Sequence, residues 1–177
     1  MAFVSWLWWA PLGAAVLHIG EEFIYPGGFA SWDRNYRSSI QTSITPRLHF
    51  VVNALLLGAC VSVGLSGMPD GALVVGGIRL GSPISSSLSV AGWLILAALL
   101  LSNAIFHLVG SCQTKRVSPG VRTGLLLYVP LALVGYWYFI QTRQVSALAA
   151  GASALLGGSY HFWASLAHRW RARSHEV

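Results

Sequence analysis

Apolar residues run along the chain in segments long enough to cross a bilayer, and clusters of polar residues separate these segments. A membrane-crossing helix needs about 20 predominantly apolar residues. The pattern predicts spans at residues 3–23, 46–65, 86–110, 123–140 and 145–167. The sequence therefore predicts an all-α fold, in which residues 1–177 form a single integral membrane domain built as a polytopic helical bundle with five transmembrane helices.

The segments between the predicted spans have patterns of their own. In residues 29–44, apolar side chains recur at spacings of three and four, which predicts a short helix lying in the membrane interface. The turn residues Met68-Pro69-Asp70-Gly71, followed by two short apolar pieces, predict a small hairpin or an irregular cap. The Ala/Gly-rich residues 147–158 predict a helix that packs closely on a neighbour.

Composition and charge support a membrane protein with a defined orientation. Only 9% of residues are charged, against about 25% in a typical soluble protein. The net charge of +6 could indicate nucleic acid, but the distribution of the basic residues indicates topology instead. With five spans, one face receives Arg34, Arg37, Arg47, Lys115, Arg116, Arg122, Arg169, Arg171 and Arg173, and the other receives Arg79 and Arg143. The positive-inside rule then predicts a cytoplasmic C-terminus and an outside N-terminus in the plasma or inner membrane, with no nucleic-acid partner.

Ionisable residues enter the apolar spans at one common depth. His18, Glu21 and Glu22 fall within an arc of about 100° at the end of the first predicted span. With the predicted orientation, three further histidines from three other spans reach roughly the same depth, namely His49, His107 and His161. Because buried ionisable groups in a membrane are costly, this coincidence predicts a shared functional site.

The local spacings favour a metal centre. Asn53 follows His49 by four residues, and His107 follows Asn103 by four, so each amide shares a helix face with a histidine. Imidazoles and carboxylates bind divalent metals, while neighbouring amides hold the ring N–H groups. We predict a divalent metal, zinc or iron, held by residues from four spans with Asn53 and Asn103 supporting the rings. The predicted ligands are His18, Glu22, His49, His107 and His161.

The stretch His18-Ile19-Gly20-Glu21-Glu22 resembles the defining motif of the HXXEE family of small multi-span membrane proteins. The stretch from Asn103 to His107, followed after a basic loop by Pro119-Gly120, is also similar to that family. The likeness extends from His18 to the fifth predicted span. The resemblance implies that His18, Glu21 and Glu22 matter for function, and it implies no particular reaction.

Two chemistries fit such a site on an apolar or lipid-like substrate at the cytoplasmic leaflet. A zinc hydrolase would use Glu21 or Glu22 as the catalytic residue that takes a proton from water. A non-haem iron oxidoreductase would draw its ligands from the same histidines and glutamates. The chain lacks the HxxxH and HxxHH runs of the membrane desaturases, which argues against that particular chemistry.

The alternative is a non-catalytic membrane subunit or metal-binding protein whose His/Glu cluster is structural. On that interpretation Asn53 and Asn103 would be interhelical hydrogen-bonding residues, and His161 would be a hydrogen-bonding core residue. Glu21 would then turn to Arg37 or Arg47 at the interface. The oligomeric state is not predicted by any pattern in the sequence.

Overall fold

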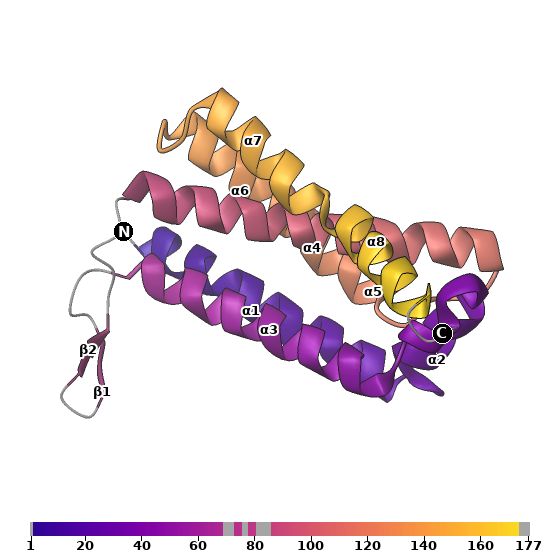
Figure 1. The fold of residues 1–177 in the computed structure, drawn as a ribbon. Helices are drawn as coiled ribbons and strands as arrows, with labels where there is room; N and C mark the ends of the chain where they lie inside the picture. The colour runs from indigo at the N-terminus through magenta and orange to yellow at the C-terminus, as the bar shows by residue number, and fades with distance from the viewer. Residues whose placement is uncertain (1, 69–72, 76–77, 81–85, 174–177) are drawn as a thin grey trace.

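The computed structural model describes residues 2–68, 73–75, 78–80 and 86–173, and these form a bundle of helices (Figure 1). The longer helices are α1 (Ala2–Ile24), α3 (Pro46–Ser66), α4 (Ser86–Thr114), α6 (Val129–Gln141), α7 (Ala147–Gly158) and α8 (Tyr160–Arg173). α1 packs along α3, and α4 packs against α6 and α7. α8 continues beyond α7 toward the end of the bundle that holds α2 (Gly28–Tyr36).

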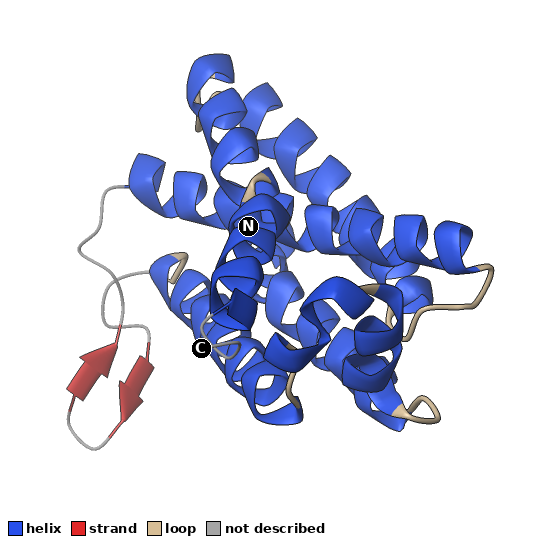
Figure 2. Ribbon diagram, turned by 45° about the vertical axis from the view of Figure 1, so that its right-hand side comes forward, coloured by secondary structure: helices blue, strands red, loops and turns tan. Residues whose placement is uncertain are grey.

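Short elements join the long helices. α2 follows Gly27, whose left-handed φ of 84° turns the chain, and the 3-10 helix η1 (Ser38–Ser43) follows α2. The predicted helix at residues 29–44 is therefore present as two shorter pieces. Strands β1 (Leu73–Val75) and β2 (Ile78–Leu80) pair antiparallel apart from the helices (Figure 2), which confirms a hairpin. Pro69, Asp70 and Gly71 of its predicted turn signal lie outside the described residues.

Three of the described helical segments are long and apolar enough to cross a membrane, namely Pro46–Ser66, Ser87–Thr114 and Val121–Gln141. The prediction of five spans is therefore not confirmed. The segment predicted at residues 145–167 breaks at Ser159 into α7 and α8, so neither piece is long enough. α1 is continuous over 23 residues, but the ionisable residues of the HXXEE stretch occupy its last two turns.

The core of the bundle is organised around α4. Trp93 on α4 is fully buried, and its indole Nε1 donates a hydrogen bond to the backbone oxygen of Leu7 on α1 at 3.0 Å. Phe139 on α6 packs against Trp93 with ring centroids 5.3 Å apart. Gly135 makes room for this indole, because a Cβ at that position would lie 2.0 Å from the Trp93 ring. These contacts fix α1 and α6 on two sides of α4.

The close approach of α7 to α4 depends on Gly157. A Cβ there would lie 2.1 Å from the backbone oxygen of Ile95 and 2.9 Å from the backbone nitrogen of Leu99. The predicted tight packing of residues 147–158 is thus confirmed at this position. Gly151, on the same helix, has nothing within 4 Å of its Cβ position.

We expect Gly157→Ala to lower the free energy of unfolding by about 1–3 kcal/mol, because the methyl group overpacks a contact between two backbones. Gly151→Ala is the matched control and should be neutral or slightly stabilising, since alanine favours the helix. Thermal unfolding of the two variants in the same detergent measures the difference. Equal midpoints would contradict the packing described here.

Candidate metal centre

Three potential metal ligands from two helices meet inside the bundle. His18 and Glu22 are one turn apart on α1 and share a face, and His107 approaches from α4. Their exposed fractions are 1%, 3% and 0%. Oε1 of Glu22 lies 3.4 Å from Nε2 of His18 and 3.2 Å from Nε2 of His107. The three ligand atoms all lie within 4.8 Å of one another, and we call this group the His/Glu cluster.

The separations within the His/Glu cluster suit a bound metal ion. In a tetrahedral zinc site with bonds of about 2.0–2.1 Å, neighbouring ligand atoms lie about 3.3–3.4 Å apart. Nε2 of His107 is buried and has no hydrogen-bond partner among the described residues, although Glu22 Oε1 is 3.2 Å away. In the neutral tautomer with the proton on Nδ1, next to Ser118, this nitrogen would present its lone pair to a metal ion. Two imidazoles and one carboxylate are a donor set that catalytic zinc and non-haem iron sites both use.

A chain of hydrogen bonds favours one tautomer of the neutral His18 ring. The Thr123 hydroxyl donates to Oε2 of Glu21 at 2.6 Å, and the Thr123 backbone N–H donates to the same oxygen at 2.8 Å. Because the hydroxyl has only one hydrogen, it must accept from Nδ1 of His18, which is 3.0 Å away. Nε2 of His18 then keeps its lone pair toward Glu22. The Nδ2 of Asn103 contacts this Nε2 at 2.9 Å and would compete with a metal ion for it.

The loop after α4 holds both histidine rings in place. Nδ1 of His107 lies 2.8 Å from Oγ of Ser118, whose backbone N–H donates to Oγ of Ser111 at 2.9 Å. Gly120 has a φ of 93°, in the left-handed region that favours glycine. A Cβ at Gly120 would lie 2.7 Å from Cε1 of His18 and 3.1 Å from Cε1 of His107. A larger residue would displace the rings, so glycine is what lets the loop close over them.

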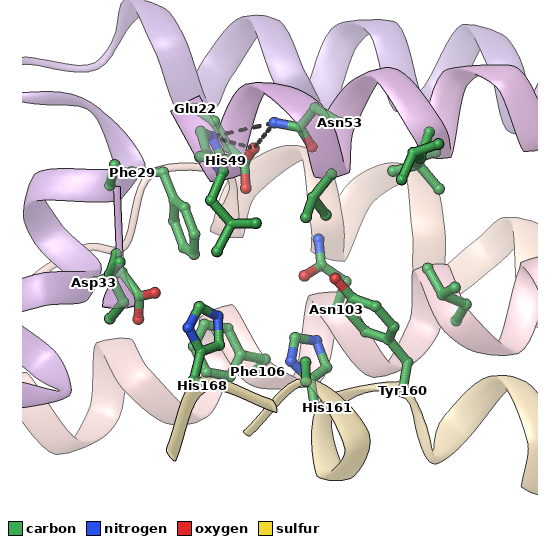
Figure 3. A pocket seen from close by; sticks show the side chains of 18 of the residues that line it. Glu22, Phe29, Asp33, His49, Asn53, Asn103, Phe106, Tyr160, His161 and His168 are labelled. Atoms are coloured by element: carbon green, nitrogen blue, oxygen red, sulfur yellow. Dashed lines mark hydrogen bonds and ion pairs between the residues drawn. The ribbon is translucent and has the colours of Figure 1, made fainter. Parts of the chain in front are cut away.

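The second oxygen of Glu22 faces α3. Nε2 of His49 lies 3.4 Å from Oε2, and the Asn53 amide donates to Oε2 at 3.3 Å (Figure 3). Nδ2 of Asn53 also contacts Nε2 of His49 at 3.1 Å. His49 thus approaches Oε2 of Glu22, and it does not belong to the His/Glu cluster. The carboxylate is held from α1, α3 and α4 at once.

The structure places His161 apart from the His/Glu cluster. Its ring stacks on Phe106 with centroids 4.6 Å apart and planes 5° from parallel. Its Nε2 is buried and has no hydrogen-bond partner among the described residues. His161 and Glu22 both line one cavity of 340 Å³, from opposite sides (Figure 3). The histidine on α8 therefore faces the cavity instead of the other predicted ligands.

The structure brings together most of the residues that the sequence predicted for the site, and it places His161 and Glu21 outside the His/Glu cluster. His18, Glu22 and His107 form the cluster, and His49, Asn53 and Asn103 surround it. Glu21 turns away, although not to the arginines considered above, because its partners are Thr123 and the backbone N–H of Arg122. Sequence reasoning did not single out Ser111, Ser118 or Thr123. The Pro119-Gly120 turn was the one available signal for this loop.

The fold and the site define a class of protein: a helical bundle with membrane-length apolar helices and a buried cluster of histidine and glutamate. The chain belongs to the HXXEE family, whose description is a protein of unknown function with HXXEE motif, and the match covers residues 8–135. His18, Glu21 and Glu22 are the motif residues in this chain. No curated protein and no solved structure matches the chain.

Thr123→Val should weaken metal binding by about 10–100-fold, because it removes the hydroxyl that holds the His18 ring in its ligating tautomer. Thr123→Ser is the matched control, since it keeps the hydroxyl and should retain the affinity. Competition with a coloured chelator measures both variants with zinc. If the valine variant binds zinc as tightly as the wild type, the hydrogen-bond chain has no influence on the site.

Proposed function

We propose that the protein is an integral-membrane metalloenzyme that acts on an apolar or lipid-like substrate at the cytoplasmic leaflet. One observation carries this proposal: two imidazole nitrogens and a carboxylate oxygen lie within 4.8 Å of one another inside an apolar bundle. Buried ionisable groups in an apolar bundle are costly, so a cluster of this kind indicates a functional site. A cavity of 340 Å³ beside Glu22 supplies space for a substrate.

Nε2 of His18, Nε2 of His107 and Oε1 of Glu22 would hold the metal in this proposal. Three protein ligands leave at least one position for water or substrate, as catalytic sites require. Zinc would polarise a carbonyl or lower the pKa of a bound water, whereas iron would support oxidation chemistry. Since the same donor set serves both metals, the identity of the metal separates the hydrolase from the oxidoreductase.

We assign proton transfer to Glu22 and His49 and positioning to Glu21. The Glu21 carboxylate accepts from the Thr123 hydroxyl and from two backbone N–H groups, so its oxygens are occupied away from the cavity. Glu22 and His49 both line the cavity, and their facing atoms lie 3.4 Å apart. A proton released from water beside Glu22 could therefore be accepted by the Glu22 carboxylate and passed to the His49 imidazole.

The membrane placement in this proposal adds α1 and the α7–α8 segment to the three helices of membrane length. Five crossings would bring the first loop, the loop after α4 and the C-terminal segment to one face, where nine of the eleven Lys and Arg residues lie. The positive-inside rule makes that face cytoplasmic. The HXXEE motif then lies near the cytoplasmic leaflet.

A second candidate function is a non-catalytic membrane protein with a structural cluster. The observation that favours it is burial, because the three cluster side chains are at most 3% exposed. A structural cluster would need no ligand in the cavity and no exchangeable position on a metal. Metal content and reactivity separate it from the enzyme.

Purified protein should contain about one metal ion per chain if the His/Glu cluster is a metal site. We expect His107→Ala and Glu22→Gln to lose this metal, because each removes one of three ligands. His168→Gln is the control, since that histidine lies outside the cluster and contacts Ser43. Inductively coupled plasma mass spectrometry identifies zinc or iron. A folded wild-type protein that holds neither metal, even after incubation with both, would contradict the metalloenzyme.

The proposed orientation predicts which side of the membrane exposes Cys112. This thiol is exposed near the end of α4, whereas Cys60 is buried and serves as an internal control. A membrane-impermeant maleimide should label Cys112 only in vesicles that present their cytoplasmic face. Labelling of Cys112 only in vesicles that present the opposite face would show that the proposed orientation is wrong.

A further inference from the structure

The cavity beside the His/Glu cluster is polar in its middle and apolar at one end. α3 and α4 run antiparallel there, so residues late in α3 meet residues early in α4. The apolar end is lined by Leu55, Leu56, Ala59, Leu96 and Leu99. The middle is lined by Glu22, His49, Asn103 and His161 (Figure 3). A ligand that fills this space would need one apolar chain and one polar group.

His161 lines the middle of the cavity and carries a polar atom that no described residue uses. Its Nε2 is buried without a hydrogen-bond partner among the described residues, and stacking on Phe106 holds the ring in place. An unsatisfied buried nitrogen costs free energy, so a partner from a bound ligand would be favourable. A hydroxyl or carbonyl group between His161 and Glu22 would lie beside the proposed metal ligands.

The charged end of the cavity has no free cation for an anionic headgroup. Arg37 is the one Lys or Arg among the described residues that line it. Its Nε donates to Oδ1 of Asp33 at 2.7 Å, and its Nη2 donates to Oδ2 of the same carboxylate. Burial lowers the pKa of His168, which lines the same end, and the nearby Arg37 charge acts in the same direction. A phosphate or carboxylate would find no unpaired positive side chain here.

The apolar end reaches the surface of the bundle on α3. Leu55 lines the cavity and is 70% exposed, and it lies within a helix that is long and apolar enough to cross a membrane. A chain could therefore pass from the hydrocarbon of the bilayer into the cavity without crossing water.

We infer that the cavity binds a single-chain, uncharged lipid, such as a long-chain alcohol or its ester. Its chain lies along the apolar residues of α3 and α4, and its oxygen faces His161 beside Glu22. This inference names the substrate class of the proposed metalloenzyme and therefore rests on that proposal for its catalytic meaning.

The test measures binding of radiolabelled hexadecanol to the wild-type protein in detergent, with 1-alkanols of increasing length as competitors. Affinity should rise about fourfold per added methylene group until the chain fills the apolar end, and it should then level off. Hexadecanoate should bind the chelator-treated, metal-free protein at least about tenfold more weakly than hexadecanol, because its carboxylate would find neither an unpaired basic side chain nor a metal ion.

Two variants locate the binding site. Ala59→Trp fills the apolar end, so the affinity should stop rising at a shorter alkanol chain length than in the wild type. Leu126→Trp adds the same indole at a position that is 73% exposed and outside the cavity lining, so the chain-length profile should stay as in the wild type. His161→Phe keeps an aromatic ring stacked on Phe106, and it should weaken the binding of hexadecanol by about tenfold because the hydrogen bond to the imidazole is lost.

The outcomes separate this inference from the proposed function. Three outcomes would overturn the inference: absence of saturable hexadecanol binding, tighter binding of hexadecanoate than of hexadecanol to the metal-free protein, or identical chain-length profiles for the wild type and Ala59→Trp. The expected profile in a protein that holds no metal would support the lipid site and refute the metalloenzyme.

Discussion

The rest of the structure depends on the burial of the Glu22 carboxylate. A carboxylate that is 3% exposed in an apolar bundle is stable only with partners that compensate the loss of water. Glu22 is surrounded by His18 from α1 itself, His107 from α4, and His49 with Asn53 from α3. The Asn53 amide donates to it, and a metal ion shared with His18 and His107 would supply the compensating charge. The compensation therefore requires α1, α3 and α4 to pack in one register. The same requirement places the cavity, because the side of Glu22 that these partners leave open is the side where α8 approaches.

The two glutamates of the motif differ in role because of their direction from α1. Adjacent residues on a helix point about 100° apart, so Glu21 and Glu22 cannot face the same partners. Glu22 faces the histidines, whereas Glu21 faces the backbone N–H groups and hydroxyl at the start of α5 (Val121–Thr123). The two acids still act on one ring, since Glu21 reaches His18 through Thr123 on one side and Glu22 contacts it on the other.

Periodicity and depth predicted much of the site and only part of the fold. Spacings of four residues correctly placed Asn53 beside His49, and the common depth correctly brought His49 and His107 to α1. Depth along a helix does not fix which side a ring faces, so His161 could not be assigned to the cavity from sequence. The break between α7 and α8 was also not predicted, although Gly157 and Gly158 precede it, because glycine is also frequent in membrane-spanning helices. The contacts of Ser118 and Thr123 depend on a loop conformation, which no helical pattern encodes.

The π-helical turn η2 (Gly124–Tyr128) lies directly after the residues that hold His18. The N–H of Val129 bonds to the oxygen of Gly124, so this turn contains one residue more than an α-helical turn would. The Tyr128 ring lies against His18, with centroids 4.5 Å apart. If the same residues wound as an ordinary α-helix, Val121–Thr123 would rotate by about 100° relative to α6, because one residue would pass into the next turn. The Thr123 hydroxyl would then leave Glu21 and the imidazole together, so its position at His18 depends on the wider winding of this turn.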